Sequence, residues 1–226
     1  MGNRAFVTNK NMELGVYLHW NGGRDSIEAF CKYCELRGFR DDDYGMARFV
    51  QVVANYFGGG LSIGIEPFKY WTMGDNNGLY VIDNWKIVGR YAPRYMNVAT
   101  GKIISKWDYY DELSDEERED YAVTLGPWDG PEQNSHPLWE MVADIDAAQP
   151  IQDQIGDLGK CIEVPIDRVQ TGDVVKYSNW RGRYVTSTVV DDAEQTAKVE
   201  PEPYRYVLTD DGEKVYEGSR YLVIRK

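Results

Sequence analysis

Cysteine, histidine and long hydrophobic runs are all scarce in this sequence. Three cysteines in 226 residues is a low and odd count, typical of a reducing compartment rather than of a disulfide scaffold. No run of about 18 apolar residues is present, so the sequence offers no transmembrane helix. The first residues also lack the apolar stretch of a signal peptide. We therefore expect a soluble protein of the cytoplasm, without a membrane partner.

Basic charge is also in short supply. The chain has 25 lysines and arginines against 37 acidic residues, for a formal net charge of −12. An acidic surface repels phosphate backbones, so direct nucleic-acid binding is not expected of the chain as a whole. The excess is uneven, because the thirteen residues Asp108–Asp120 contain eight acids and one base.

Apolar and aromatic residues are plentiful enough to form a core, at 42% and 13% of the chain. A Ser-x-x-Glu capping box at Ser114 predicts a short acidic helix over about 115–123. Three longer helices are predicted where apolar residues repeat with helical spacing. The inward residues of the three stretches are Ile27, Phe30, Cys31 and Cys34; Met46, Phe49, Val50, Val53 and Phe57; and Leu138, Met141, Val142 and Ile145.

Short β-type runs occupy most of the remaining sequence. In the first 100 residues they lie near 5–8, 15–20, 61–65, 79–82 and 85–91. From Cys161 onward the helical period disappears, and about five short strands predict a small barrel of the SH3-like type. The fold class is therefore α+β, with an α+β domain at 1–149, an acidic insertion near 107–121, and an all-β barrel at 160–226.

The acidic insertion is the main candidate for a partner-binding surface. Its carboxylates alternate with aromatic residues and present a line of negative charge, as a phosphate backbone does. Such a surface suits the basic groove of a nucleic-acid-binding protein. The alternative interpretation of the insertion is a solvated loop with a short capped helix and no binding role. The candidate residues are Asp108, Tyr109, Tyr110, Asp111, Glu112, Asp115, Glu116 and Glu117.

A second candidate surface lies in the predicted barrel. Trp180, Arg181 and Arg183 form the clearest basic and aromatic cluster of the chain. They suit a peptide or a nucleic-acid strand, and this is the one place where direct nucleic-acid contact is expected. A charged hairpin turn explains the same residues equally well.

An alternative ligand site lies at the turn from His19 to Asp25. A strand ending in His19 is followed by glycines and a helix start, where backbone N–H groups attract anions. The residues are His19, Asn21, Gly22, Arg24 and Asp25, with Asp25 or Glu28 available to orient the imidazole. The alternative is a tight turn after a strand, so we assign no catalytic residue here.

The two helical cysteines carry no assigned chemistry. Cys31 and Cys34 have CxxC spacing, but they lie on the apolar stripe of a helix, and a second CxxC pair does not follow. We interpret them as buried core thiols. The sequence thus predicts no metal site and no cofactor.

The segment from Gly15 to Phe30, with Tyr17-Leu18-His19-Trp20-Asn21-Gly22-Gly23-Arg24-Asp25-Ser26 at its centre, resembles uncharacterised proteins of bacteriophages and mobile elements of Gram-positive bacteria. The resemblance covers about residues 1–92. It implies a mobile-element accessory protein in the bacterial cytoplasm. Together with the acidic segment, this context favours a protein that binds a host or phage protein and inhibits host defence, in the manner of an anti-CRISPR or anti-restriction protein that acts on a nucleic-acid-binding effector. The alternative is a small enzyme or a nucleotide-binding or ligand-binding module at the His19–Gly23 turn.

Overall fold

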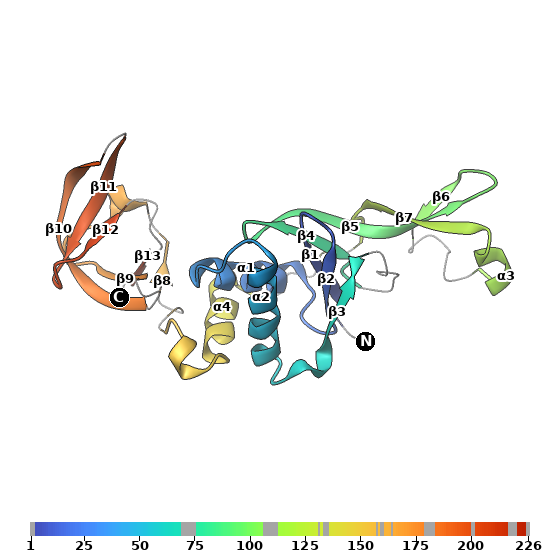
Figure 1. The fold of residues 1–226 in the computed structure, drawn as a ribbon, viewed down its shortest axis with the longest axis horizontal. Helices are drawn as coiled ribbons and strands as arrows, with labels where there is room; N and C mark the ends of the chain where they lie inside the picture. Colours follow the sequence, from blue (N-terminus) through green and yellow to red (C-terminus); the bar gives the residue numbers. More distant parts are fainter. Residues whose placement is uncertain are drawn as a thin grey trace.

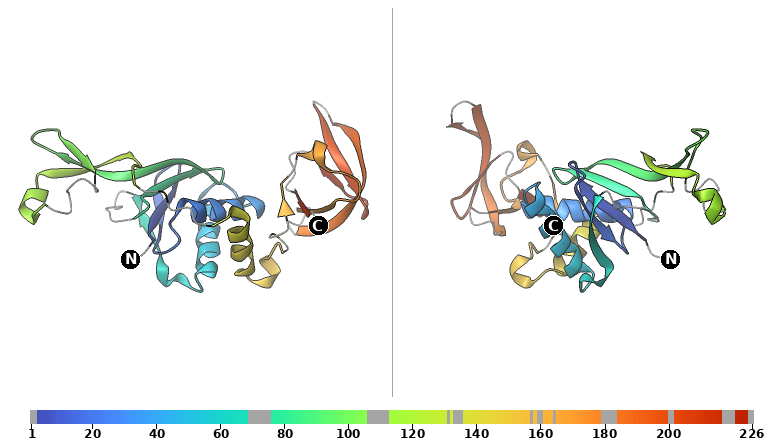
Figure 2. Two further views of the ribbon diagram at one scale, coloured as in Figure 1. Left: turned by 180° about the vertical axis from the view of Figure 1, so that it is seen from behind. Right: turned by 45° about the vertical axis from the view of Figure 1, so that its right-hand side comes forward.

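The protein is a mixed α+β chain with two β-sheets, shown by a computed structural model (Figure 1). The structure describes residues 3–68, 76–105, 113–130, 132, 136–156, 158, 161–163, 165–178, 184–199, 202–216 and 221–224. The predicted α+β class is confirmed at this level. Two further views in Figure 2 show the sheets on opposite sides of a group of helices.

The first sheet is formed by strands from the first 127 residues, in the order β3-β2-β1-β4-β5-β6, with β7 paired to β5. Strands β1 and β4 are parallel, and the other pairs are antiparallel. The strands are β1 (Ala5–Asn9), β2 (Leu14–Leu18), β3 (Ile63–Pro67), β4 (Leu79–Asp83), β5 (Lys86–Asn97), β6 (Ile103–Ser105) and β7 (Tyr121–Pro127).

Three helices cover one face of this sheet, and the sequence predicts each of them. Helix α1 (Arg24–Leu36) begins after Gly23. Asp25 lies in its first turn, where a carboxylate interacts favourably with the positive end of the helix dipole. Helix α2 (Asp43–Tyr56) is capped by Asp42, which accepts a hydrogen bond from the Gly45 N–H at 3.1 Å. Helix α4 (Leu138–Ala147) packs against α1.

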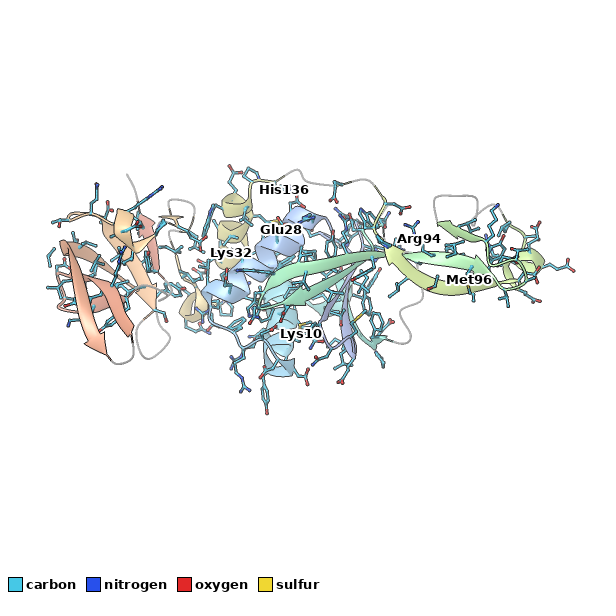
Figure 3. The ribbon with its side chains drawn as sticks, turned by 90° about the horizontal axis from the view of Figure 1, so that it is seen from above. Lys10, Glu28, Lys32, Arg94, Met96 and His136 are labelled. Atoms are coloured by element: carbon cyan, nitrogen blue, oxygen red, sulfur yellow. The ribbon has the colours of Figure 1, made fainter. Side chains whose placement is uncertain are left out.

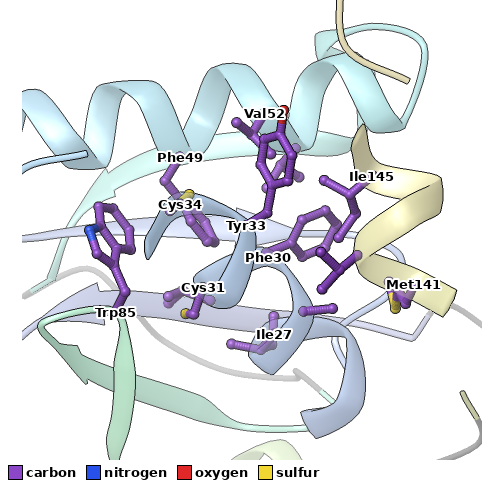
Figure 4. Packing of buried hydrophobic residues seen from close by; sticks show 14 of the residues in the cluster. Ile27, Phe30, Cys31, Tyr33, Cys34, Phe49, Val52, Trp85, Met141 and Ile145 are labelled. Atoms are coloured by element: carbon purple, nitrogen blue, oxygen red, sulfur yellow. The ribbon is translucent and has the colours of Figure 1, made fainter. Parts of the chain in front are cut away.

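The main core lies between these helices and the sheet (Figure 4). Phe30 of α1 meets the ring of Phe49 edge to face, and Phe49 stacks on Trp85. Because successive strand residues point to opposite faces, Phe6, Leu79 and Val81 form a second, smaller cluster on the other face of the sheet.

The second sheet has the strand order β12-β11-β10-β9-β13-β8, and its described residues show no closed barrel. The predicted SH3-like barrel is therefore not confirmed. The long strand β10 pairs first with β9 over 184–188 and then with β11 from Val189 onward, and no described pairing joins the end strands β12 and β8. The strands are β8 (Cys161–Ile162), β9 (Val174–Ser178), β10 (Tyr184–Val199), β11 (Glu202–Thr209), β12 (Lys214–Tyr216) and β13 (Tyr221–Ile224).

The segment between the sheets is packed against the helices instead of serving as a free linker. Ile155 and Leu158 are buried in the main core, as is Leu222 of β13. The carboxylate of Asp146 in α4 accepts hydrogen bonds from the N–H groups of Ile155 and Gly156, each at 2.7 Å. The described residues between the two predicted domains, 150–156 and 158, thus help to dock the second sheet onto the first part of the chain.

The short acidic helix is shorter than predicted. Helix α3 spans only Asp115–Arg118, and β7 begins at Tyr121, inside the predicted range 115–123. Strand pairing explains the difference, because residues from Tyr121 onward hydrogen-bond to β5 over seven registered pairs. The capping box itself is confirmed, with the side chains and backbone of Ser114 and Glu117 bonded reciprocally.

Candidate functional site: a projecting acidic β-arm

The outer halves of β5 and β7, together with β6 and α3, form an arm that projects from the body of the protein (Figure 1). Asn97 of β5 lies opposite Tyr121 of β7, while Met96 lies opposite Ile103 of β6. Figure 3 shows Arg94 at the base of the arm and Met96 farther out. Continuous pairing from Tyr91 to Asn97 gives the arm a regular hydrogen-bonded backbone.

Helix α3 lies at the tip of the arm with its carboxylates in solvent. Asp115, Glu116, Glu117 and Glu119 are all exposed. Hydrogen bonds from the backbone and hydroxyl of Ser114 lower the pKa of Glu117. The Glu117 carboxylate is thus stabilised in its charged form, and the tip holds its acids away from the core.

Two arginines lock the base of the arm to the loop that follows β7. The Arg90 guanidinium lies between the rings of Tyr80 and Trp128, 4.7 and 4.0 Å from their centroids. It also pairs with Glu132 at 2.6 Å, and only 6% of its side chain is exposed. Arg94 pairs with Asp129 at 2.6 Å. The buried Arg90 guanidinium and these two ion pairs join the root of the arm to the loop after β7.

The structure describes only part of the predicted partner-binding set. Asp115, Glu116 and Glu117 lie together on the arm tip. The other predicted acidic and aromatic residues of the insertion fall outside the described residues, as does the basic cluster of the second sheet: Asp108, Tyr109, Tyr110, Asp111 and Glu112; Trp180, Arg181 and Arg183.

The His19 turn is built by close backbone packing. A Cβ atom at Gly22 would lie 2.6 Å from the Arg4 carbonyl carbon, and the Gly22 N–H donates to the Asn3 carbonyl at 2.8 Å. Asn21 has a positive φ of 53°, which asparagine tolerates better than most residues. The glycine is thus required by the approach of the N-terminal segment.

The side chains of this turn do not converge as a catalytic group. The His19 ring hydrogen-bonds to the Tyr17 hydroxyl at 2.9 Å and meets Trp20 edge to face. Arg24 instead pairs with Glu28 along the helix at 2.7 Å. Of the two carboxylates proposed to orient His19, Glu28 thus pairs with Arg24, and Asp25 contacts His136.

A histidine that the sequence analysis did not single out pairs with Asp25. Both the backbone N–H and the ring Nδ1 of His136 lie near Asp25 Oδ2, at 3.1 and 3.2 Å. Figure 3 shows His136 above the start of α1, near Glu28. The separation of 111 residues explains why no local motif indicates this pair. It ties the segment before α4 to the first turn of α1.

Cys31 and Cys34 are fully buried in the main core, as predicted. Burial raises the pKa of both thiols far above the usual value, so the reactive thiolate is disfavoured. Within the ranges the structure describes, no three acidic, histidine or cysteine side chains converge on one point.

A cleft of about 560 Å³ lies between the C-terminal end of α1 and the second sheet. Lys32 on its wall pairs with Glu35 at 2.8 Å and with Glu163 at 2.5 Å. The Tyr184 hydroxyl donates to the Leu36 carbonyl beside it. These contacts join α1 to the second sheet, and Lys32 is already satisfied by two carboxylates.

Comparison with known proteins gives no family for this chain. No family model matches it, and the searches of curated proteins and of solved structures also return no match. The resemblance of the segment 15–30 to phage proteins therefore stays a prediction. Among the described residues, no helix is long and apolar enough to cross a membrane.

Proposed function

We propose that this protein acts by binding another macromolecule, with the acidic tip of the arm as the contact surface and a basic protein surface as the partner. The observation that carries this proposal is the placement of α3. Its exposed acids lie at the end of a β-arm whose root is locked by Arg90 and Arg94. A rigid projection of one charge sign favours rapid, oriented association with a partner of opposite sign.

A groove that normally holds nucleic acid is the basic surface that best suits this tip. Asp115, Glu116 and Glu119 follow one another within five residues, a spacing of charge comparable with that of a phosphate backbone. The phage-like segment adds context to the proposal. A bacterial defence nuclease or CRISPR effector is a partner with the required chemistry.

The alternative of an enzyme or ligand module at the His19–Gly23 turn has weaker support. Packing against Arg4 accounts for Gly22, and Tyr17 accounts for the orientation of His19. The arm has no comparable structural explanation, because α3 adds no buried side chain to either core.

Capture from a bacterial lysate tests the proposal. The immobilised wild-type chain is compared with the variant D115N/E116Q/E119Q, which keeps the Ser114–Glu117 capping box. A matched control, E13Q/E140Q/D167N, removes three exposed charges elsewhere. We expect the arm variant to lose about 90% of the captured basic protein at low salt, and the control to retain it.

Added double-stranded DNA should release the captured partner, because both compete for one basic groove. Equal capture by the arm variant and the wild type would disprove the arm mechanism. Equal loss in both triple variants would show that net charge, and not the arm, governs binding.

A further inference from the structure

A polar pocket of about 330 Å³ lies among the helices, where the C-terminal ends of α1 and α4 meet the side of α2. Buried side chains form its inner wall, namely Tyr33, Val52 and Gln149. Figure 4 shows the ring of Tyr33 next to Val52 of α2. Because pockets for small molecules begin at about 300 Å³, this one has room for a small metabolite.

The polar atoms of the inner wall are already hydrogen-bonded within the protein. The Tyr33 hydroxyl donates to the Asp146 carboxylate at 3.0 Å. The side-chain NH2 group of Gln149 donates to two backbone carbonyls, and its oxygen accepts a hydrogen bond from Asn55 at 2.9 Å. The inner wall therefore gives the pocket its shape, and the capacity to hold a ligand lies at the rim.

Two arginines at the rim carry unused hydrogen-bond donors. The guanidinium of Arg48 lies over the ring of Phe39, 5.5 Å from the centroid, and makes no hydrogen bond or ion pair with the described residues. Arg37 is 17% exposed and donates one hydrogen bond, to the Asp153 carbonyl. Each guanidinium has five N–H donors, so most of them are unused. The exposed amide of Gln51 lies at the same rim.

Positive charge exceeds negative charge around this pocket, although the whole chain has a net charge of −12. The charged side chains that line it are the two arginines and Asp153. The Asp153 carboxylate lies 3.8 Å from Arg37, which is too far for a hydrogen bond, and is 43% exposed. The last carbonyls of α1 accept hydrogen bonds from the N–H groups of Arg37, Gly38 and Phe39, so they are already paired.

We propose that this pocket binds a small phosphate ester, such as a sugar phosphate, through Arg37 and Arg48. A guanidinium binds phosphate oxygens with parallel N–H···O hydrogen bonds. A phosphate group has enough charge and enough acceptor oxygens to satisfy two arginines together. Gln51 and Asp153 can then hydrogen-bond the hydroxyl groups of the ester. The pocket lies apart from the arm, so this proposal does not depend on the arm as a contact surface.

Isothermal titration calorimetry of the full chain tests the site, with ribose 5-phosphate, inorganic phosphate and ribose as probes. We expect saturable binding of ribose 5-phosphate at one site, with a Kd of about 0.1–1 mM. Inorganic phosphate should bind about fivefold more weakly or less tightly still, because it leaves much of the pocket empty. Ribose should not bind detectably, because it offers no charge to the arginines.

Three variants locate the binding. Arg48→Gln should weaken ribose 5-phosphate binding at least about tenfold without unfolding, because the side chain is exposed. Arg40→Gln is the matched control and should bind as the wild type does. The Arg40 guanidinium also lies over a ring, 5.4 Å from the centroid of Tyr44, and pairs with Asp42 outside the pocket. Asp153→Asn should tighten inorganic phosphate binding about threefold, because it removes a repulsive charge.

Four results would overturn the proposal. They are the absence of saturable binding up to about 10 mM ribose 5-phosphate, and equal weakening by Arg48→Gln and Arg40→Gln, which would indicate only a general charge effect. The third is weaker binding of inorganic phosphate to Asp153→Asn. The fourth is inorganic phosphate that binds as tightly as ribose 5-phosphate, which would exclude the ester as the ligand. The midpoint of thermal unfolding confirms that each variant is folded.

Discussion

The buried carboxylate of Asp146 allows the sharpest test of the packing described above. Its side chain lies in α4 and is 3% exposed. It accepts three hydrogen bonds, from the Tyr33 hydroxyl at 3.0 Å and from the N–H groups of Ile155 and Gly156. One residue thus joins α1, α4 and the segment that leads to the second sheet.

Replacement of Asp146 by alanine leaves all three donors without this acceptor. Each unsatisfied buried donor costs about 1–3 kcal/mol, although water that enters the vacated space recovers part of it. We therefore expect the free energy of unfolding to fall by about 3–5 kcal/mol. In Asp146→Asn, the side-chain carbonyl can still accept a hydrogen bond, but the NH2 group would face a backbone N–H, and two donors cannot pair. We expect this variant to lower the free energy of unfolding by about 2–3 kcal/mol.

Tyr33→Phe provides the internal control. It removes one donor and leaves the carboxylate with two backbone partners, so we expect a loss of about 1 kcal/mol. Urea denaturation followed by tryptophan fluorescence measures all three variants. The reasoning is refuted if Asp146→Ala unfolds within about 0.5 kcal/mol of the wild type, or if Tyr33→Phe is the costlier change.

Three other outcomes are expected. In a Cys161→Ser variant, Cys31 and Cys34 should not react with Ellman's reagent until the protein unfolds; fast labelling in the native state would contradict their burial. Burial and a hydrogen bond raise the pKa of Tyr177 to about 12 from 10.0, so its contribution to stability is complete below pH 10 and is lost as the pH rises toward 12. Tyr177→Phe should make the stability curve flatter there. Arg90→Gln should lower the free energy of unfolding by about 2–3 kcal/mol and shift tryptophan emission to the red, and an unchanged spectrum would argue against the stacked guanidinium.

The helices were predictable because their signals are local. The spacing of Ile27, Phe30 and Cys34 places one apolar stripe on α1, and Ser114 with Glu117 forms a capping box within four residues. Only neighbours in sequence are needed to recognise such patterns. The core thiols follow from the same stripe.

The arm was not predictable, although its acidic residues were. The pairing of Asn97 with Tyr121 joins two strands that are separated in sequence by β6 and α3, and no propensity of either strand specifies its partner. That pairing shortened the predicted helix and turned an acidic insertion into a projecting tip. The order of the second sheet depends on strand pairing in the same way, because β10 pairs with β9 before Val189 and with β11 from there on.

The sequence by itself determined the strongly acidic segment, the apolar stripes of the helices and the capping box at Ser114. Only the tertiary structure decided where those features lie. It brought His136 to Asp25 over 111 residues, placed Arg90 between Tyr80 and Trp128, and set the acids of α3 at the tip of the arm. Helix signals act over one or two turns, whereas these contacts depend on strand register and on packing between residues far apart in the chain.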